Sequence, residues 1–338
     1  MNPLRVGVIG AGWVATERHI PSFRRHPKAD VVALVDRHAD RAAAVAERMA
    51  IPFHTSELEA LFDLDVDAVS LCTPPWTHAE LACAALERGI HVFTEKPMAM
   101  NAAEAESMVV AARAAGRLLC VSHNFLFSRS VRRADRLLER DGGARYVFGV
   151  QLSSTRRRLP NWYEELPGGL LLDESPHVLY TLQHFLGHLS LEHARATQGP
   201  GRGQPASVEL LVRGQTGLGQ VTMLFDAPVS EWHVSLVGPS RVVDLDLFRD
   251  IVVNVGADGA HNPGDILRTS ASALGQHALG FASSGLRYAT KRLYWGHDAL
   301  IDSFVDAVLN GGPAPVDPEE SLEVVRLTDA ILTDLHLV

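Results

Sequence analysis

Hydrophobic and polar positions follow two different periods along the chain, and the change falls near residue 140. Up to about residue 121, short apolar runs predict strands, with alanine-rich segments of helical spacing between most of them. This alternation is typical of a parallel sheet with helices on both faces. The predicted strands are residues 4–9, 31–35, 68–71, 90–93 and 118–121, and the predicted helices are residues 41–49, 78–88 and 102–115.

Beyond residue 140, apolar residues recur at every second position, and turn formers such as "GPGRGQP" and "GQTGLGQ" separate the runs. This pattern predicts a second sheet that is largely antiparallel. Helical spacing returns in residues 178–186, 299–309 and 318–335. The predicted strands are residues 144–152, 191–197, 207–212, 219–224, 233–237, 241–247 and 251–255.

The chain is long enough for two domains, because its 338 residues exceed the roughly 250–300 at which a single core stops growing. We predict an α/β protein with a doubly wound parallel sheet in residues 1–122. Residues 123–338 are expected to form a second α/β domain with a large, open, mainly antiparallel sheet. Residues 264–295 are mildly helical and rich in small residues, so an excursion and an oligomer contact are both open.

Composition narrows the range of partners. The formal net charge of −9 gives no excess of positive charge to hold a phosphate backbone, so nucleic acid is not an expected partner. No stretch approaches the ~20 apolar residues of a membrane span, and the N-terminus lacks a signal-peptide layout. We expect a cytoplasmic protein. Cys72, Cys83 and Cys120 lie in apolar surroundings at spacings that suit neither a disulfide framework nor zinc.

The first predicted strand ends in "VIGAGWVATERH", which sets Gly10, Gly12 and Ala15 in a G-x-G-x-x-A spacing. A dinucleotide site needs the first glycine for a tight turn and the second for close approach of the pyrophosphate. The small third residue lets the helix pack on the strand. The second strand ends in Asp36, near the offset where a carboxylate accepts ribose hydroxyls. An acid there repels a 2′-phosphate and favours NAD, although Arg37, His38 and Arg41 keep NADP open.

Two further strand ends carry candidate contacts. Residues 68–71 continue into "CTPPWTHAEL", whose Thr73, Pro74 and His78 are expected to line the nicotinamide side, since ligands bind outside the carboxyl ends of strands. A proline-stiffened turn is the alternative. The strand 90–93 ends in Glu95, Lys96 and Pro97; because proline restricts the backbone on both sides, the lysine is held in a fixed direction.

These residues resemble the oxidoreductase family named for glucose-fructose oxidoreductase, inositol dehydrogenase and the rhizopine catabolism protein MocA (Gfo/Idh/MocA). The resemblance rests on four segments: "GVIGAGWVA", "VDAVSLCTPPWTHAELACAALERGIHVFTEKPMAM", "PGGLLLDESPH" and "HDALIDSFVDAVLNGGPAPVDPEESLEVVRLTDAI". It implies a Rossmann domain followed by an open-sheet domain that often forms the oligomer interface. It also implies hydride transfer between NAD or NADP and a sugar or polyol, and a homo-oligomer formed through the C-terminal sheet.

The resemblance places Lys96 in the family's Glu-Lys-Pro motif, where the lysine contacts substrate and cofactor, and Asp173 and His177 in its D-x-x-x-H pair. Asn124 falls in a loop that often meets the substrate. The chain departs from common members at three places. Glycine is common where Ser175 or Pro176 stands, an acid where Tyr180 stands, and arginine where Leu126 stands.

The chemistry follows from these side chains. Oxidising a carbinol requires a base for the hydroxyl proton, and the reverse reaction needs the same group as an acid. We predict His177 as acid and base, because histidine titrates near neutrality. Lys96 stabilises an alkoxide when charged and takes the proton when neutral, and Asp173 orients the imidazole or the substrate. If residues 170–186 are helical, Asp173 and His177 share one face.

The run "STRRRLPNWYEELPGG" precedes this pair. Consecutive arginines are usually a solvated loop. The alternative is a substrate lid in which Arg156 binds an acidic group and Trp162 and Tyr163 stack on a sugar. No metal is expected, since His184, His188 and His193 offer no rigid ligand spacing. The expected dinucleotide contacts are Gly10, Gly12, Trp13, Val14, Asp36, Arg37, Thr73, Pro74, His78, Glu95 and Lys96.

Three functions compete. The leading hypothesis is an NAD(P)-dependent dehydrogenase or reductase acting on CH–OH groups of a sugar, polyol or sugar derivative. The first rival is a glycosidase or lyase that retains NAD and returns it unchanged after each turnover. The second is a non-catalytic dinucleotide or sugar sensor, which the presence of both Lys96 and His177 disfavours.

Overall fold

The computed structural model describes residues 3–154, 156, 162–199, 204–290, 292–293 and 295–338. It divides into two compact units. The first contains residues 1–123 and 297–326, and the second contains residues 124–296 and 327–338. The expected division assigned all of residues 123–338 to the second domain. The structure instead returns residues 297–326 to the first unit.

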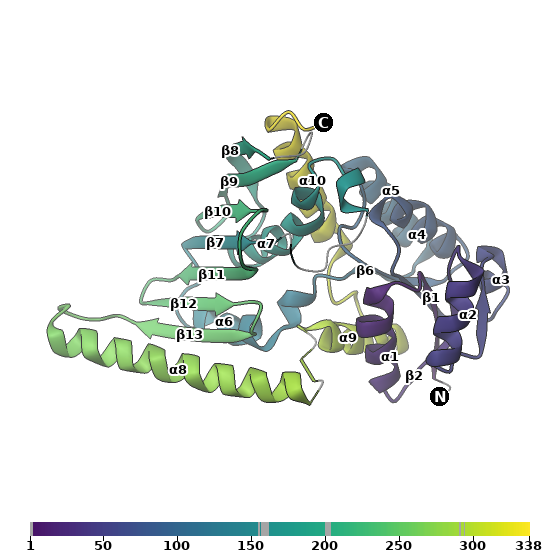
Figure 1. The fold of residues 1–338 in the computed structure, drawn as a ribbon, viewed down its shortest axis with the longest axis horizontal. Helices are drawn as coiled ribbons and strands as arrows, with labels where there is room; N and C mark the ends of the chain where they lie inside the picture. The colour runs from purple at the N-terminus through teal and green to yellow at the C-terminus, as the bar shows by residue number, and fades with distance from the viewer. Residues whose placement is uncertain (1–2, 155, 157–161, 200–203, 291, 294) are drawn as a thin grey trace. The chain divides into compact units, whose positions relative to one another are not determined.

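The first unit is built on a six-stranded sheet in which all neighbouring strands are parallel. The strand order reverses between β1 and β4, which is where doubly wound sheets bind ligands. Along the sheet (Figure 1) the strands are β3 (Phe53–Thr55), β2 (Ala29–Val35), β1 (Leu4–Ile9), β4 (Ala68–Leu71), β5 (His91–Thr94) and β6 (Leu119–Val121).

The helices of the first unit cover a nearly continuous apolar sheet, as expected when parallel strands are buried on both faces. All four residues of β4 are buried. Leu322 and Val325, from the C-terminal segment 297–326 that belongs to this unit, join the core cluster that contains Met108. The helical segments are η1 (Ala15–His19), α1 (Ile20–Arg25), α2 (Ala39–Arg48), α3 (Leu58–Phe62), η2 (Pro75–Thr77), α4 (His78–Glu87), α5 (Ala102–Ala115) and α9 (His297–Asn310).

The second unit carries a seven-stranded sheet whose neighbours are antiparallel except for the β7–β10 pair. The prediction of a second, mainly antiparallel sheet is confirmed. In order across the sheet (Figure 1) the strands are β13 (Ile251–Gly256), β12 (Arg241–Asp246), β11 (Glu231–Val237), β7 (Tyr146–Leu152), β10 (Leu218–Leu224), β9 (Pro205–Arg213) and β8 (Ser190–Gln198).

One face of this second sheet is covered by helix. Buried and exposed residues alternate along β7, and Gly149 on its buried side leaves room for Val178, which would lie 3.1 Å from an added Cβ. The helical segments are η3 (Asn124–Phe127), α6 (Arg129–Glu139), η4 (Tyr163–Glu165), α7 (Leu170–Leu186) and α8 (Pro263–Ala289), and α10 (Pro318–Asp334) crosses the division between the units. None of the described helices is long and apolar enough to cross a membrane.

The elements that the pattern did not predict are short, or are dominated by charged or small residues. The strand β3 and the helix α3 have three and five residues, too few for a clear period. The helix α6 is dominated by charge, and α8 by small residues. The helix α7 begins at Leu170, eight residues before the predicted start, because it continues through Pro176.

Candidate active site

The glycine turn after β1 has the geometry that a dinucleotide requires. Gly10 has a positive φ of 97°, and a Cβ there would lie 2.6 Å from the Cys72 carbonyl oxygen. At Gly12 the nearest atom to an added Cβ is 3.9 Å away, so the backbone is open to a ligand. The Thr16 amide donates to the Gly12 carbonyl at 3.1 Å, and Ala15 is fully buried. A pyrophosphate fits this turn without rearrangement of the backbone.

Asp36 lies at the end of β2 and is held from three sides. Its Oδ2 accepts from the Ala11 amide at 2.9 Å, and its Oδ1 accepts from the His38 amide at 2.9 Å. Arg41 forms a two-pronged ion pair with the same carboxylate, at 3.0 and 2.7 Å. Burial alone would raise the pKa of Asp36, but the hydrogen bonds from Arg41, His38 and Ala11 lower it below the ordinary value. The carboxylate is therefore ionised and fixed in direction.

The other predicted dinucleotide residues differ in exposure. Trp13 is 45% exposed, and the Arg18 guanidinium lies 4.7 Å from its ring centroid. Arg37 is exposed and donates to the His38 ring at 3.2 Å. The remaining predicted contacts that are partly buried are Val14, Thr73 and Pro74.

His78 has a different place from the one expected. Its ring is fully buried, with Nδ1 2.9 Å from the Pro97 carbonyl oxygen and Nε2 2.9 Å from the Thr73 carbonyl oxygen. Burial lowers the pKa of His78. Because both ring nitrogens are engaged by backbone, we assign His78 a scaffolding role that ties the end of β4 to the turn after β5, in place of the predicted cofactor contact.

The strand β5 leads into Glu95 and Lys96, and the peptide bond to Pro97 is cis. Glu95 is 8% exposed, whereas Lys96 is partly buried. The Glu95 Oε2 accepts from the Lys96 amide at 3.2 Å. The acid therefore fixes the backbone of the lysine, one of the roles that its position suggests.

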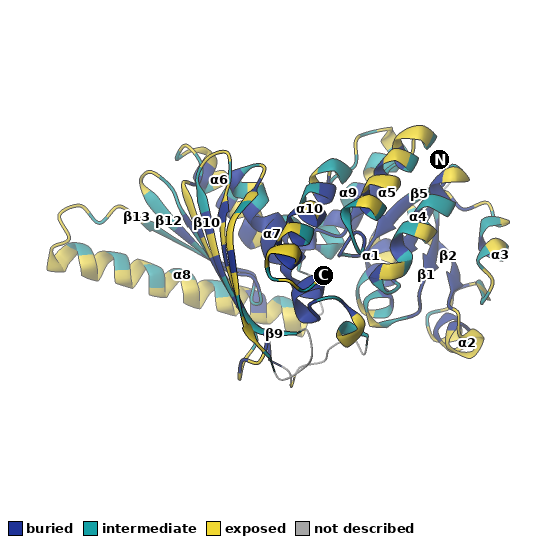
Figure 2. Cartoon of the chain, turned by 90° about the horizontal axis from the view of Figure 1, so that it is seen from above, coloured by how far each residue is buried: buried dark blue, intermediate teal, exposed yellow. Residues whose placement is uncertain are grey.

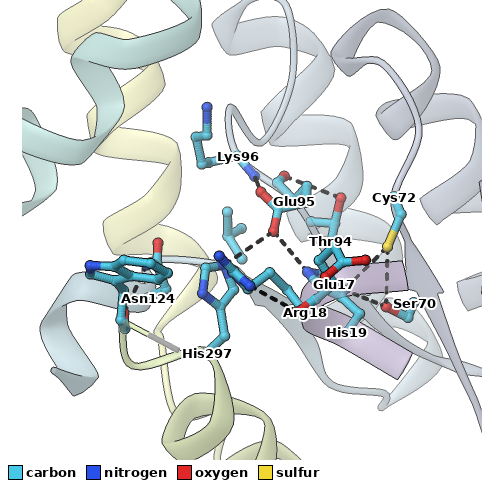
Figure 3. Close-up of polar contacts among 12 residues, drawn as sticks. Glu17, Arg18, His19, Ser70, Cys72, Thr94, Glu95, Lys96, Asn124 and His297 are labelled. Carbon is cyan, nitrogen blue, oxygen red and sulfur yellow. Dashed lines mark hydrogen bonds and ion pairs between the residues drawn. The ribbon is translucent and has the colours of Figure 1, made fainter. Parts of the chain in front are cut away.

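Glu95 is also the centre of a buried cluster with two histidines (Figure 3). Its Oε1 lies 2.8 Å from His19 Nε2 and 3.8 Å from His297 Nε2. The His19 Nδ1 lies 2.8 Å from the Ser70 hydroxyl and 3.2 Å from the Cys72 sulfur. This cluster joins η1, β4, the end of β5 and the start of α9 within the first unit.

The directions of the pKa shifts indicate which groups in this cluster are charged. Burial favours a protonated Glu95, but the hydrogen bonds and charge interactions of His19 and His297 together outweigh it and hold the pKa of the carboxyl well below its usual range. Burial lowers the pKa of His19 in spite of the same bond. We therefore describe an ionised Glu95 that accepts from the Nε2–H of a neutral His19, while Ser70 donates to Nδ1.

The ligand atoms of His19, Glu95 and His297 all lie within 4.8 Å of one another, a spacing that a metal ion would tolerate. We interpret the group as a hydrogen-bonded cluster, because the His19–Glu95 distance of 2.8 Å is that of a direct hydrogen bond.

In the second unit, α7 carries two of the three predicted catalytic residues. Asp173 and His177 are buried and stand four residues apart in one continuous helix. The His177 ring lies between aromatic neighbours, with centroids 5.0 Å from both Phe125 and Trp232. These aromatic side chains cover much of the imidazole and offer it few polar contacts.

One hydrogen-bonding partner of the imidazole is Tyr180, one turn further along α7. His177 Nδ1 and the Tyr180 oxygen lie 2.8 Å apart. The same oxygen accepts from the Phe125 amide at 3.2 Å and lies 3.4 Å from Asn124 Oδ1, to which it donates. The Asn124 amide donates to the Trp295 carbonyl at 2.9 Å. Asn124 therefore belongs to the support of the imidazole through Tyr180.

The proposed lid is described only in part. Arg156 is exposed and its amide donates to the Ser154 hydroxyl at 3.3 Å, whereas Trp162 and Tyr163 are partly buried. Burial raises the pKa of Tyr163, and Glu164 adds to the shift. Arg157 and Arg158 lie outside the described residues.

Three participants were missed from the sequence: His19, His297 and Tyr180. The two histidines are 278 positions apart (297 − 19) and meet only through the fold. Tyr180 follows His177 by three residues, so helical spacing alone could have indicated the contact.

The chain was compared with known protein families, proteins and solved structures. Residues 4–123 match the model of the Gfo/Idh/MocA oxidoreductase family with an NAD-binding Rossmann fold. These residues therefore match the NAD-binding domain of that family.

Two characterised relatives are sugar enzymes by name. The chain is 35% identical over 209 residues to 1,5-anhydro-D-fructose reductase of Ensifer adhaerens, covering 59% of this chain and 62% of that one. It is 31% identical over 206 residues to D-glucoside 3-dehydrogenase of Escherichia coli (strain K12), covering 58% and 57%. The chain thus spans about three fifths of the length of these relatives.

The fold extends further than the sequence similarity. A solved structure of levoglucosan dehydrogenase in complex with NADH and L-sorbose superposes with a TM-score of 0.83, covering 99% of this chain and 97% of that one. The sequence identity is 19%, so this match shows the fold of both units and no more.

Proposed function

We propose that the protein is an NAD-dependent oxidoreductase that moves hydride between nicotinamide and a secondary alcohol or ketone of a sugar or sugar derivative. The observation that carries the proposal is the imidazole of His177, which is buried among aromatic rings and held through Nδ1 by a phenol. The names of the characterised relatives support the sugar class.

The phenol suits proton transfer because it can hold the imidazole in one tautomer. When the phenol donates to Asn124, the imidazole Nδ1–H donates to Tyr180 and Nε2 is the basic nitrogen. When Nε2 takes the proton, the imidazolium keeps the same Nδ1–H bond to Tyr180. This one arrangement therefore serves both the base and the acid that the reaction needs.

The proposal gives the remaining residues the roles that the sequence predicted. Lys96, fixed by Glu95 and Pro97, stabilises negative charge on the substrate oxygen. Asp173 orients the substrate from the helical turn before His177. Bound NAD supplies or accepts the hydride. Gly10, Gly12 and the first helical turn hold its pyrophosphate, and Asp36 holds the adenosine ribose.

The experiment is a screen of sugars, polyols and their phosphates and nucleotide conjugates with both cofactors, followed by nicotinamide absorbance. Turnover by the natural chain and its loss in Lys96→Ala, with NAD binding retained, support the proposal. Full turnover in that variant contradicts the role of the lysine. NAD that survives dialysis, together with turnover that leaves the absorbance unchanged, indicates a redox-neutral glycosidase or lyase instead.

The cofactor preference has its own test. Asp36→Ala is expected to weaken NAD more than NADP, because it removes the ribose acceptor and frees Arg41 for a 2′-phosphate. The exposed Asp40→Ala is the matched control, since it removes the same charge four residues away. Fluorescence titration with both nucleotides measures the ratio. An unchanged preference removes Asp36 from the ribose site.

A further inference from the structure

The long helix α8 attaches to the second sheet by only one of its faces. Gln276 exchanges hydrogen bonds with the backbone of Asn254 on the edge strand β13, at 2.9 and 3.0 Å. Arg287 pairs with the buried Asp250 at 2.8 Å. Gly280 allows close approach, since an added Cβ would lie 2.7 Å from the Ile251 side chain. The helix therefore covers the edge of the sheet (Figure 1). The rest of the helix surface points away from the sheet.

Away from the sheet, α8 carries large apolar residues in two rows. Leu279 and Leu286, which are 74% and 67% exposed, form the short row, and the longer row is a repeat of seven residues. Leu267, Leu274, Phe281 and Tyr288 follow one another at this interval and are 71%, 72%, 59% and 69% exposed. Residues seven apart on an α-helix drift by only ~20°, so the four side chains form one stripe. Figure 2 shows exposed residues along the length of α8. We call these four residues the α8 stripe.

Small residues alternate with the large ones along the stripe. Ala271, Ala278 and Gly285 stand four positions after Leu267, Leu274 and Phe281, respectively, and all three are exposed. Intervals of four and three residues are those of a coiled-coil seam, in which large side chains of one helix fit over small ones of the other. Between residues 269 and 286 the sequence contains no Asp, Glu, Lys or Arg. Depletion of charge marks the centre of a protein interface.

We propose that the α8 stripe is an interface between two copies of this chain, whose α8 helices pack antiparallel. The pattern is self-complementary. Pairing Leu267 with Tyr288 and Leu274 with Phe281 uses one twofold axis between residues 277 and 278, as an isologous dimer requires. The four side chains expose roughly 500 Å² per copy, and the small residues between them raise the pair to about 1,200 Å², above the ~1,000 Å² of a specific interface.

The test measures particle mass in solution. Leu274→Glu places a charge at the centre of the stripe and is expected to halve the mass measured by light scattering. The sheet-face association that the family resemblance implies would be a separate interface, so halving is expected from either a dimer or a tetramer. Leu279→Glu is the matched control, because it makes the same change at a leucine that is 74% exposed on the same helix but outside the stripe, and it is expected to keep the natural mass.

A cross-link tests the antiparallel register. Ala278→Cys lies beside the proposed axis and is expected to form a disulfide between copies, whereas Ser272→Cys is not. Both are made with Cys83→Ser, because Cys72 and Cys120 are already buried. Circular dichroism and NAD titration check that each variant is folded.

Three results overturn the proposal: a natural chain that is monomeric, an unchanged mass in Leu274→Glu, and cross-linking that is equal at positions 272 and 278. Sedimentation of a monomeric natural chain with phosphatidylcholine–phosphatidylserine vesicles, abolished by Leu274→Glu, would assign the stripe to a lipid surface instead.

Discussion

Two of the buried imidazoles, His19 in the first unit and His177 in the second, have contrasting surroundings. His19 is paired with the carboxylate of Glu95 and enclosed by Ser70 and Cys72. His177 is paired with the phenol of Tyr180 and enclosed by aromatic rings. Both rings make a polar contact at 2.8 Å, so distance does not distinguish them. They differ in the chemistry of the partner, which is a carboxylate for His19 and a phenol for His177.

A carboxylate that accepts from several donors has no proton to exchange, and its position is fixed by the fold. A phenol that donates to Asn124 can accept from Nδ1–H and leave Nε2 to exchange a proton. The contrast supports the proposal that His19 belongs to the structure that positions Lys96 and that His177 transfers the proton. Four experiments break or sharpen this comparison.

The largest effect is expected from His177→Ala. Loss of the acid and base should lower kcat by about 10²–10⁴-fold while NAD binding is unchanged. His184→Ala is the control, because His184 lies on the same helix and pairs with Asp135 at 2.7 Å. Steady-state kinetics and nucleotide titration provide the two readouts. Full turnover in His177→Ala would remove the distinction between the two imidazoles.

The second effect concerns stability. His19→Leu leaves the buried carboxylate of Glu95 without its closest side-chain donor and is expected to lower the free energy of unfolding by about 3–5 kcal/mol. Glu95→Gln removes the buried charge and keeps the shape of the side chain, and it should cost about 1–3 kcal/mol. Urea unfolding of both variants shows which one loses more stability. A greater loss in Glu95→Gln would mean that His19 carries the charge.

The third effect is a dependence of stability on pH. Burial lowers the pKa of His91 to about 4, with Arg117 adding to the shift, and that of His123 to about 3. The unfolded chain takes up protons at these sites below about pH 6.5 and the folded chain does not, so acid favours unfolding. For His123 alone the slope approaches ~1.4 kcal/mol per pH unit between these limits. Urea midpoints that stay constant from pH 7 to 5 would contradict this burial.

The smallest effect is expected from Tyr180→Phe. It keeps the aromatic volume but removes the partner of His177 Nδ1, which should lower kcat by roughly 10-fold, equivalent to one hydrogen bond. The pH dependence of kcat should also shift, which a purely structural role would not produce. ¹⁵N chemical shifts of the imidazole report the tautomer directly. A tautomer and a pH profile identical to those of the natural chain would exclude the phenol from positioning.

The parts of the fold that the sequence predicted are those with a strong local period. The strands β1 and β4 match the predicted residues because their apolar runs are short and bounded by turn formers. The glycine turn and Asp36 were predictable because spacing within a strand–turn–helix unit is local. The short β3 has no such signal, whereas α6 has a helical period that its many charged residues obscured.

The parts that were not predictable depend on contacts between distant residues. His19, Glu95 and His297 meet because the C-terminal segment returns to the first unit, and periodicity contains no information about that return. The burial of His78 follows from two carbonyl oxygens supplied by separate turns. Whether Lys96 and His177 act on one substrate remains a prediction for the kinetic experiments.

The return of residues 297–326 has a consequence for biosynthesis. Phe304 of α9 packs against Phe93 of β5 with ring centroids 5.4 Å apart, and His297 completes the cluster at Glu95. A ribosome therefore delivers the last pieces of the nucleotide-binding unit only after the whole second sheet has been synthesised. A fragment cut after residue 123 would display this aromatic surface to solvent, so the unit is not a module that can be transplanted as a single N-terminal piece.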